Sequence, residues 1–167
     1  MPAEHESLVR TLVASISAML LTGCVMLAGY GMVEFRGTSM LPTIKDGQRL
    51  HTLKLDQKTK ADLKRGDVVV FRAPADQTKS YIKRIIALPG DRIEIRRGEV
   101  WLNGLKQSEP YLSDRLNVNL RTFAEVSLQP NAYYIMGDNR DNSADSRMFG
   151  PVSGDLIEAK VVLPLSE

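Results

Sequence analysis

A run of 23 residues without a charged side chain, from Thr11 to Val33, restricts the possible folds of this chain more than any other stretch. Arg10 precedes the run and Glu34 follows it. A helix rises about 1.5 Å per residue, so the run would reach about 35 Å, and the hydrocarbon core of a bilayer is about 30 Å thick. We therefore predict a transmembrane anchor over residues 11–33, with a polar flank over 1–10 and a folded domain over 34–167.

Other interpretations of this run stay open. Small residues near Ala28 permit a secretory signal that is removed by cleavage. The stretch Leu21–Cys24 matches the motif at which bacterial lipoproteins are lipidated, although the residues after it continue apolar where a lipoprotein normally becomes polar. The length of the run favours a retained span, and a buried core helix of this length does not suit so small a chain.

After the run, short apolar stretches alternate with turn signals. The patterns predict strands over residues 68–71, 81–87, 92–95, 99–102, 133–136 and 157–163, and loops over 54–64 and 73–80. Asn103-Gly104 is a strong hairpin signal. Residues 106–131 are less patterned, and we expect the segment 91–136 to be a short excursion that pairs only partly. Because no long amphipathic helix is indicated after the run, we predict a mainly β fold, with an antiparallel β-barrel-like domain behind one N-terminal transmembrane helix.

Composition argues against two classes of function. The formal net charge is +2 and there is no dense basic run, which disfavours nucleic acid as a partner. The chain has one cysteine, Cys24, and two histidines, His5 and His51, so a zinc site built by the protein is not expected. We expect neither a metal nor another cofactor.

Three polar motifs carry the candidate chemistry. They are Gly37-Thr38-Ser39-Met40-Leu41-Pro42-Thr43, then the stretch Tyr81–Asp91, and then Gly137-Asp-Asn-Arg-Asp-Asn-Ser-Ala-Asp-Ser-Arg147. The first supplies a possible nucleophile, the second a possible base, and the third a polar loop able to orient both.

A serine and a lysine can act together only under a specific condition. A serine hydroxyl needs a base to take its proton, and a lysine is a base only as the neutral amine. The pKa of the lysine must then fall by several units from about 10.4, which desolvation can achieve. On a strand, Lys83 would share an apolar face with Tyr81 and Ile85. Considered alone, Lys83 resembles an ordinary surface lysine, so the interpretation depends on the other two motifs.

In this order, the three motifs resemble those of the type I (leader) signal peptidases. The resemblance covers the apolar anchor and residues 35–152, and the eleven-residue third motif is complete. It implies a membrane-bound serine endopeptidase that removes signal peptides from exported preproteins through an acyl-enzyme. A lysine at position 83, where the eukaryotic reticulum enzymes carry histidine, implies a bacterial-type enzyme.

The resemblance also implies roles for individual residues. Ser39 would be the nucleophile and Lys83 its general base. Ser143 would hydrogen-bond the lysine amine, and Asp145 would pair with Arg147 to support the loop.

The resemblance further implies a substrate cleft and an oxyanion hole. Met40 would help to shape the cleft, and we expect Met40 and Leu41 to face the membrane interface. The Ser39 N–H would be one oxyanion donor. Gly37 stands where some members carry a serine that supplies the second donor, so that donor must come from the backbone, with Gly37 as the candidate, or from water.

The implied substrates are preproteins with small residues, typically alanine, at the first and third positions before the cut. Membrane lipid is the other implied partner. The catalytic domain would lie on the outer face of the bacterial cytoplasmic membrane, attached by a single span.

Three alternative functions remain open. Self-cleaving repressors share the serine/lysine dyad, but they lack a membrane span and the complete third motif. A pilin- or conjugation-type processing peptidase would differ only in its substrate. A catalytically silent adaptor that binds peptides at the membrane would keep the fold without turnover.

Overall fold

The computed structural model describes residues 29–162 of the chain. Contacts divide the chain into two units, Met1–Tyr30 and Gly31–Glu167, and nearly all described residues belong to the second. The described elements are β1 (Tyr30–Glu34), β2 (Arg49–Lys54), α2 (Gln57–Lys60), β3 (Val68–Ala73), β4 (Asp76–Ala87), β5 (Arg92–Arg96), β6 (Glu99–Leu102), β7 (Leu105–Lys106), β8 (Phe123–Ser127), β9 (Ala132–Met136), α3 (Ser146–Phe149), β10 (Val152–Ser153), a 3-10 turn η1 (Gly154–Leu156) and β11 (Ile157–Val162).

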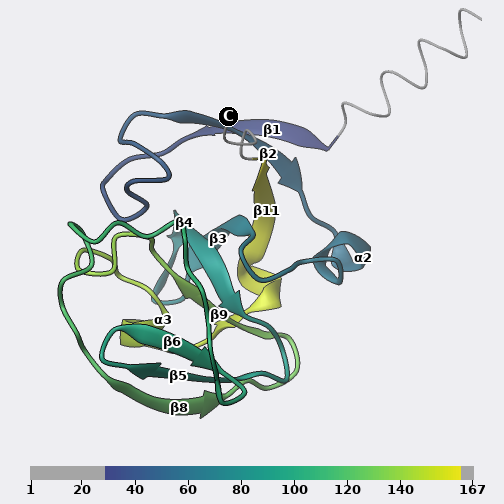
Figure 1. Ribbon diagram of the computed structural model, residues 1–167. Helices are drawn as coiled ribbons and strands as arrows, with labels where there is room; N and C mark the ends of the chain where they lie inside the picture. Colours follow the sequence, from purple (N-terminus) through teal and green to yellow (C-terminus); the bar gives the residue numbers. More distant parts are fainter. Residues whose placement is uncertain (1–28, 163–167) are drawn as a thin grey trace, which may run out of the picture. The chain divides into compact units, whose positions relative to one another are not determined.

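Two sheets make up the described part of the chain (Figure 1). The larger has seven strands in the order β1-β2-β11-β3-β4-β9-β10, and its pairings from β2 to β10 are antiparallel. Strand β3 lies in the middle of this sheet, and its first four residues are all buried because both of its faces are covered. The sequence of a strand buried on both faces is a continuous apolar run, and Val68–Phe71 is such a run.

The smaller sheet has the order β7-β6-β5-β8 and is also antiparallel. Two tight turns build it. Arg97-Gly98 joins β5 to β6, and Asn103-Gly104 joins β6 to β7. All four of these turn residues have positive φ, the conformation that two-residue hairpins with the right-handed strand twist require. The hairpin signal at Asn103 is therefore confirmed.

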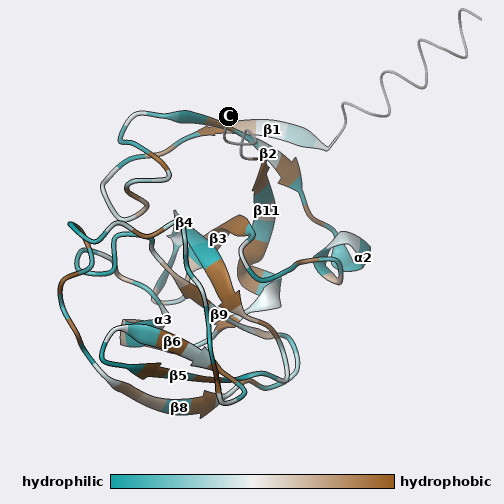
Figure 2. Ribbon diagram, in the orientation of Figure 1, coloured by the Kyte–Doolittle hydropathy of each residue, from teal (hydrophilic) through white to brown (hydrophobic). Residues whose placement is uncertain are grey.

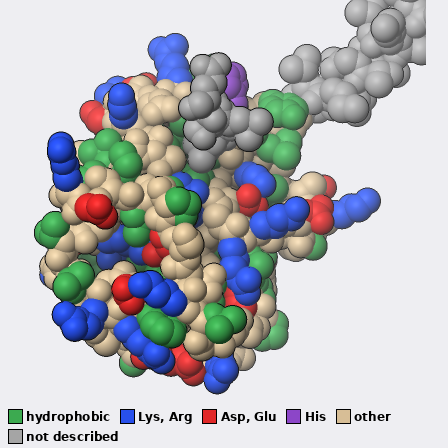
Figure 3. Space-filling view, viewed as in Figure 1, with side chains coloured by type: hydrophobic (Ala, Val, Ile, Leu, Met, Phe, Trp, Pro, Cys, Tyr) green, Lys and Arg blue, Asp and Glu red, His purple; other side chains and the backbone are tan. Residues whose placement is uncertain are grey.

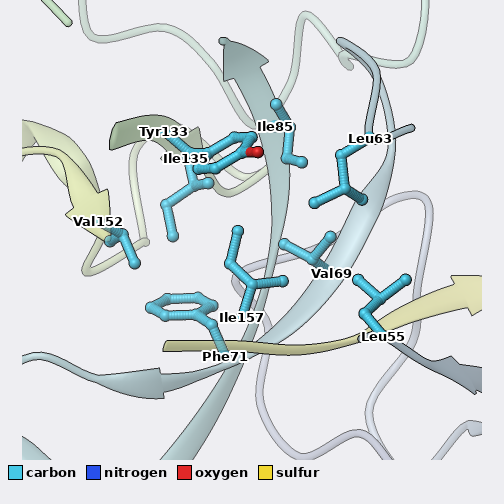
Figure 4. Packing of buried hydrophobic residues seen from close by; sticks show 9 residues of the cluster. All are labelled: Leu55, Leu63, Val69, Phe71, Ile85, Tyr133, Ile135, Val152 and Ile157. Atoms are coloured by element: carbon cyan, nitrogen blue, oxygen red, sulfur yellow. The ribbon is translucent and has the colours of Figure 1, made fainter. Parts of the chain in front are cut away.

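The core consists of three groups of buried side chains. The first packs against β3, β4, β9 and β11 (Figure 4), and Figure 2 shows that β9 and β11 are largely hydrophobic. The second joins the two sheets, because Ile86 and Met136 of the large sheet pack with Ile93 and Val100 of the small one. The third lies beneath the first polar motif, where Met40 packs with residues that include Phe35, Ile44, Leu50 and Val70.

The mainly antiparallel β fold is confirmed, but three details differ from expectation. The strand order of the large sheet is linear, with β1 and β10 at its ends, so the sheet is open and does not close as a barrel. Residues 76–80 belong to strand β4 instead of a loop. These residues are polar and largely exposed, so no apolar alternation marks them in the sequence, and Asp76 and Ser80 pair with the end of β3.

The third difference concerns the predicted anchor. Its last residues, Tyr30–Val33, lie in strand β1, so a helix cannot extend to Val33. Residues 11–28 of the predicted span lie outside the described residues. Within residues 29–162, no helix has the length and apolar character needed to cross a membrane.

Candidate active site

Ser39 and Lys83 come together although 44 positions separate them in the sequence. The Lys83 Nζ lies 2.7 Å from the Ser39 Oγ. Ser39 belongs to a bend that follows Gly37, whose φ of +112° favours glycine. The next residue, Met40, is fully buried and its carbonyl accepts a 2.9 Å hydrogen bond from the Ile44 N–H. The buried neighbour therefore fixes the backbone that carries the Ser39 hydroxyl.

The Lys83 amine lies in surroundings that disfavour its charged form. The residue is 4% exposed, on a strand whose neighbouring positions are buried. Burial lowers the pKa of Lys83 to about 8, although the negative charges of Asp145 and Asp138 oppose this effect. With this pKa, about a tenth of the amines are neutral at pH 7. The amine is within reach of the serine proton and is basic enough to take it.

A groove of about 620 Å³ runs to this pair. Its walls come mainly from two segments, residues 33–39 and 80–83. Ser39 is the last residue of the first segment, and Lys83 is the last residue of the second. Asn142 and Ala144 of the third motif also line it. Ser39 and Lys83 therefore both line the groove, where a bound peptide can reach their reactive atoms.

The third motif packs directly against the serine. The Asn139 N–H donates a 3.0 Å hydrogen bond to the Ser39 carbonyl, and the Asn139 side chain donates to the Thr38 carbonyl at 3.2 Å. A Cβ at Gly137 would lie 2.4 Å from the Ser39 carbonyl oxygen and 2.3 Å from the Ser143 Oγ. Only glycine fits at this position.

Asp145 and Arg147 form an ion pair that holds this loop. The Arg147 Nε and Nη2 donate to the two Asp145 carboxylate oxygens at 2.8 and 2.7 Å, and the Gly137 N–H donates to the same carboxylate at 3.0 Å. Burial alone would raise the pKa of Asp145, but the hydrogen bonds and charge of Arg147 outweigh it and hold that pKa below its usual value. The carboxylate thus stays charged and ties both ends of the motif together.

Comparisons with known proteins identify the family of this chain. The sequence profile of the family described as "Signal peptidase, peptidase S26" matches residues 8–166. The chain belongs to this signal peptidase family. The chain is 38% identical to signal peptidase IB of Staphylococcus aureus over 141 residues, which cover 75% of this chain and 72% of the relative. It is 36% identical to signal peptidase I of Bacillus licheniformis over 146 residues, covering 83% and 76% of the two chains.

A solved structure is also similar. A crystal structure of a signal peptidase I from Enterococcus faecalis V583 superposes with a TM-score of 0.50 and 29% identity. The match covers 57% of this chain and 92% of that one. The family expected from the three motifs is thereby confirmed, and with it the activity of a hydrolase that removes signal peptides.

Two predicted contacts of this signal peptidase are not formed. The amine of Lys83 donates to the Ile82 carbonyl at 2.9 Å in addition to Ser39, and not to Ser143. The Ser143 Oγ is buried and has no hydrogen-bond partner among the described residues. A motif match fixes the position of a serine in the chain but not the direction of its side chain.

The second failed contact concerns the oxyanion hole. The Gly37 N–H donates a 2.7 Å hydrogen bond to the Asp46 carboxylate, so it is not free to bind an oxyanion. The Ser39 N–H, in contrast, has no acceptor among the described residues. Of the two backbone donors expected, only that of Ser39 remains available.

Met40 also lies elsewhere than expected. Its side chain is fully buried and is not among the residues that line the groove. The expectation that it faces the membrane interface is wrong, because the turn after Ser39 directs it into the third core group. Met40 can shape the groove only from beneath.

Sequence reasoning missed a set of buried ion pairs around the motif. Arg84 forms a bidentate pair with Asp138 at 2.9 and 2.6 Å, and Arg140 forms one with Glu109 at 3.0 and 2.6 Å. The Tyr111 hydroxyl donates to Glu109 at 2.6 Å, and its ring lies 4.0 Å from the Arg84 guanidinium carbon. Arg84 and Asp138 belong to the motifs and could have been paired by their signs.

The other two residues of this set gave no signal. Glu109 and Tyr111 lie in the segment 106–131, whose sequence shows no regular pattern. Their role is visible only because the fold brings that segment against Arg140 and Arg84.

Proposed function

We propose that this signal peptidase cleaves preproteins by nucleophilic catalysis, with Ser39 as the nucleophile and neutral Lys83 as the general base. The observation that carries the proposal is the 2.7 Å contact between the Lys83 Nζ and the Ser39 Oγ, in a site that lowers the pKa of Lys83 to about 8. Both the geometry and the proton affinity suit transfer of the serine proton.

The proposed reaction has two halves. Lys83 takes the hydroxyl proton while the Ser39 Oγ attacks the scissile carbonyl, and the oxyanion accepts a hydrogen bond from the Ser39 N–H. The Lys83 ammonium then protonates the leaving amine of the mature protein, and the signal peptide stays as an ester on Ser39. In the second half, Lys83 takes a proton from water as the water attacks the ester, and the Lys83 ammonium returns that proton to the Ser39 Oγ as the ester bond breaks. The signal peptide leaves with a carboxylate end.

The groove supports an extended substrate. Its two lining segments, residues 33–39 and 80–83, can pair with a peptide through main-chain hydrogen bonds. Alternate side chains of an extended peptide point the same way, so the first and third residues before the cut would face the same wall. One wall would then set the requirement at both positions, and we propose that it accepts small residues, typically alanine.

A membrane location is part of the proposal. Met32 of strand β1 is an exposed apolar residue, at 60%, and it lies next to the groove-lining segment. With a single-span anchor ahead of β1, the groove would lie close to the bilayer that holds the signal peptide, which raises the local substrate concentration. The catalytic domain would then lie on the outer face of the bacterial cytoplasmic membrane.

The test is cleavage of a preprotein with an Ala-x-Ala site by the full chain in detergent, with a metal chelator present throughout. Wild type should cut after the second alanine, while Ser39→Ala and Lys83→Ala should not. Equal cutting by all three proteins would refute the assignment of the dyad. A wild type that cuts only pilin-type substrates would move the function to that class.

A further inference from the structure

A second pocket lies beyond the reactive pair. It encloses about 340 Å³ and is lined by residues 140–144 of the third motif together with Arg121, Phe123, Arg147 and Met148. Asn142 and Ala144 line both this pocket and the groove. The residues on either side of Ser143 therefore border both spaces.

We infer that this second pocket binds the first residues of the mature protein, just after the scissile bond, and that Arg121 favours an acidic side chain there. The inference rests on the proposed function. A peptide that lies along residues 33–39 reaches the Ser39 hydroxyl at the end of that segment. On the proposed path, its continuation passes Asn142 and Ala144, which border both the groove and the second pocket.

The direction of the peptide follows from the proposed membrane location. The groove segment begins at Val33, close to the predicted anchor, so the half of the substrate held in the membrane lies there. The half beyond Ser39 is then the mature chain, which leaves the bilayer.

Three arginines line the pocket, but two of them are already engaged. The Arg147 guanidinium donates to Asp145 and to the Arg140 carbonyl. The Arg140 guanidinium donates to Glu109 and to the Gly137 carbonyl. Each has a carboxylate partner and little remaining hydrogen-bonding capacity.

Arg121 differs from both. It is exposed, and its guanidinium forms no ion pair with a described residue. Its backbone is held on both sides, because its N–H donates to the Asn119 carbonyl at 2.9 Å and its carbonyl accepts from Gly98 at 2.8 Å. A free cation on a fixed backbone is suited to contact a passing carboxylate.

One acidic residue of the pocket, Asp141, opposes a preference for acidic substrate side chains. Asp141 also lines the pocket, but its two carboxylate oxygens accept hydrogen bonds from the Val118 and Asn119 N–H groups at 2.9 and 3.1 Å. On the face shown in Figure 3, basic and acidic side chains are interspersed. We expect the preference to come from a local contact, and among the described residues that line the pocket, Arg121 is the cation without a carboxylate partner.

The experiment measures kcat/KM of the full chain in detergent for a substrate series. Each substrate has an Ala-x-Ala site, and one of the first three residues after the cut is glutamate, glutamine or lysine. At one of these positions, wild type should prefer glutamate over lysine by about two- to fivefold, the size expected of one exposed ion pair. Arg121→Glu should reverse that preference, and high salt should weaken it.

Arg115→Glu is the matched control. Arg115 is exposed on the same segment and lines none of the described pockets, so this variant changes charge equally and should keep the wild-type ratio. A ratio measured on one preparation does not depend on how much of the enzyme is active. Equal ratios for Arg121→Glu and wild type, or a wild-type preference for lysine, would overturn the inference. Cutting by Ser39→Ala would instead refute the proposed function.

Discussion

The lowered pKa of Lys83 predicts two linked measurements. Only the neutral amine accepts the serine proton, so kcat/KM should rise with pH, reach half of its maximum near pH 8 and level off above it. Between pH 6 and pH 8 the neutral fraction grows from about one hundredth to about one half, which predicts an increase of about 50-fold in rate.

The same shift affects the free energy of unfolding. Unfolded Lys83 keeps its proton up to about pH 10.5, whereas the folded chain releases it near pH 8. Between these values the unfolded state binds more protons, so stability rises with pH. The penalty for the buried ammonium is about 3 kcal/mol at pH 7 and about 2 kcal/mol at pH 9.

Lys83→Met provides the reference, because methionine is of similar length and does not titrate. Urea unfolding of the full chain in detergent should show wild type gaining about 1.3 kcal/mol over Lys83→Met between pH 7 and pH 9. Suppose that the free energies of unfolding of wild type and Lys83→Met change in parallel with pH, and that kcat/KM does not change between pH 6 and pH 10. That result would refute the assignment of Lys83 as a buried base.

Three substitutions test the packing around the site. Gly137→Ala should abolish cleavage and cost about 1–3 kcal/mol in urea unfolding, because its Cβ would clash with the Ser39 carbonyl. Glu109→Gln should cost about 3 kcal/mol by the same measurement, since it leaves the buried Arg140 without its carboxylate. Met40→Ala should cost about 2–5 kcal/mol through the cavity it opens, and should leave liposome binding unchanged.

Exposed residues provide the controls for these substitutions. Glu99→Gln removes an ion pair with Lys106 in which both side chains are about half exposed, and it should cost less than about 1 kcal/mol. Leu105→Ala removes a side chain that is 70% exposed and should also have little effect. If Glu99→Gln lowered the free energy of unfolding as much as Glu109→Gln, or Leu105→Ala as much as Met40→Ala, the burial described above would be contradicted.

Local signals in the sequence were sufficient to predict many of the strands and turns of this protein. The apolar run Val68–Phe71 and the Asn103-Gly104 turn predicted a central strand and a hairpin, because strand burial and positive φ are properties of short segments. Motif order was sufficient to indicate the family and to select Ser39 and Lys83. It was not sufficient to show that their reactive atoms meet.

Tertiary structure decided what depends on contacts between distant segments. The burial that lowers the pKa of Lys83 comes from neighbours brought together by the fold, and so does the pairing of Glu109 with Arg140. The fold also decides which backbone N–H groups are available to an oxyanion, because the Gly37 N–H donates to the Asp46 carboxylate. Sequence by itself determined most of the strands and turns and the three motifs, because these are properties of short segments. Only the fold decided which of their atoms are buried, paired or free, because those states depend on residues far away in the chain.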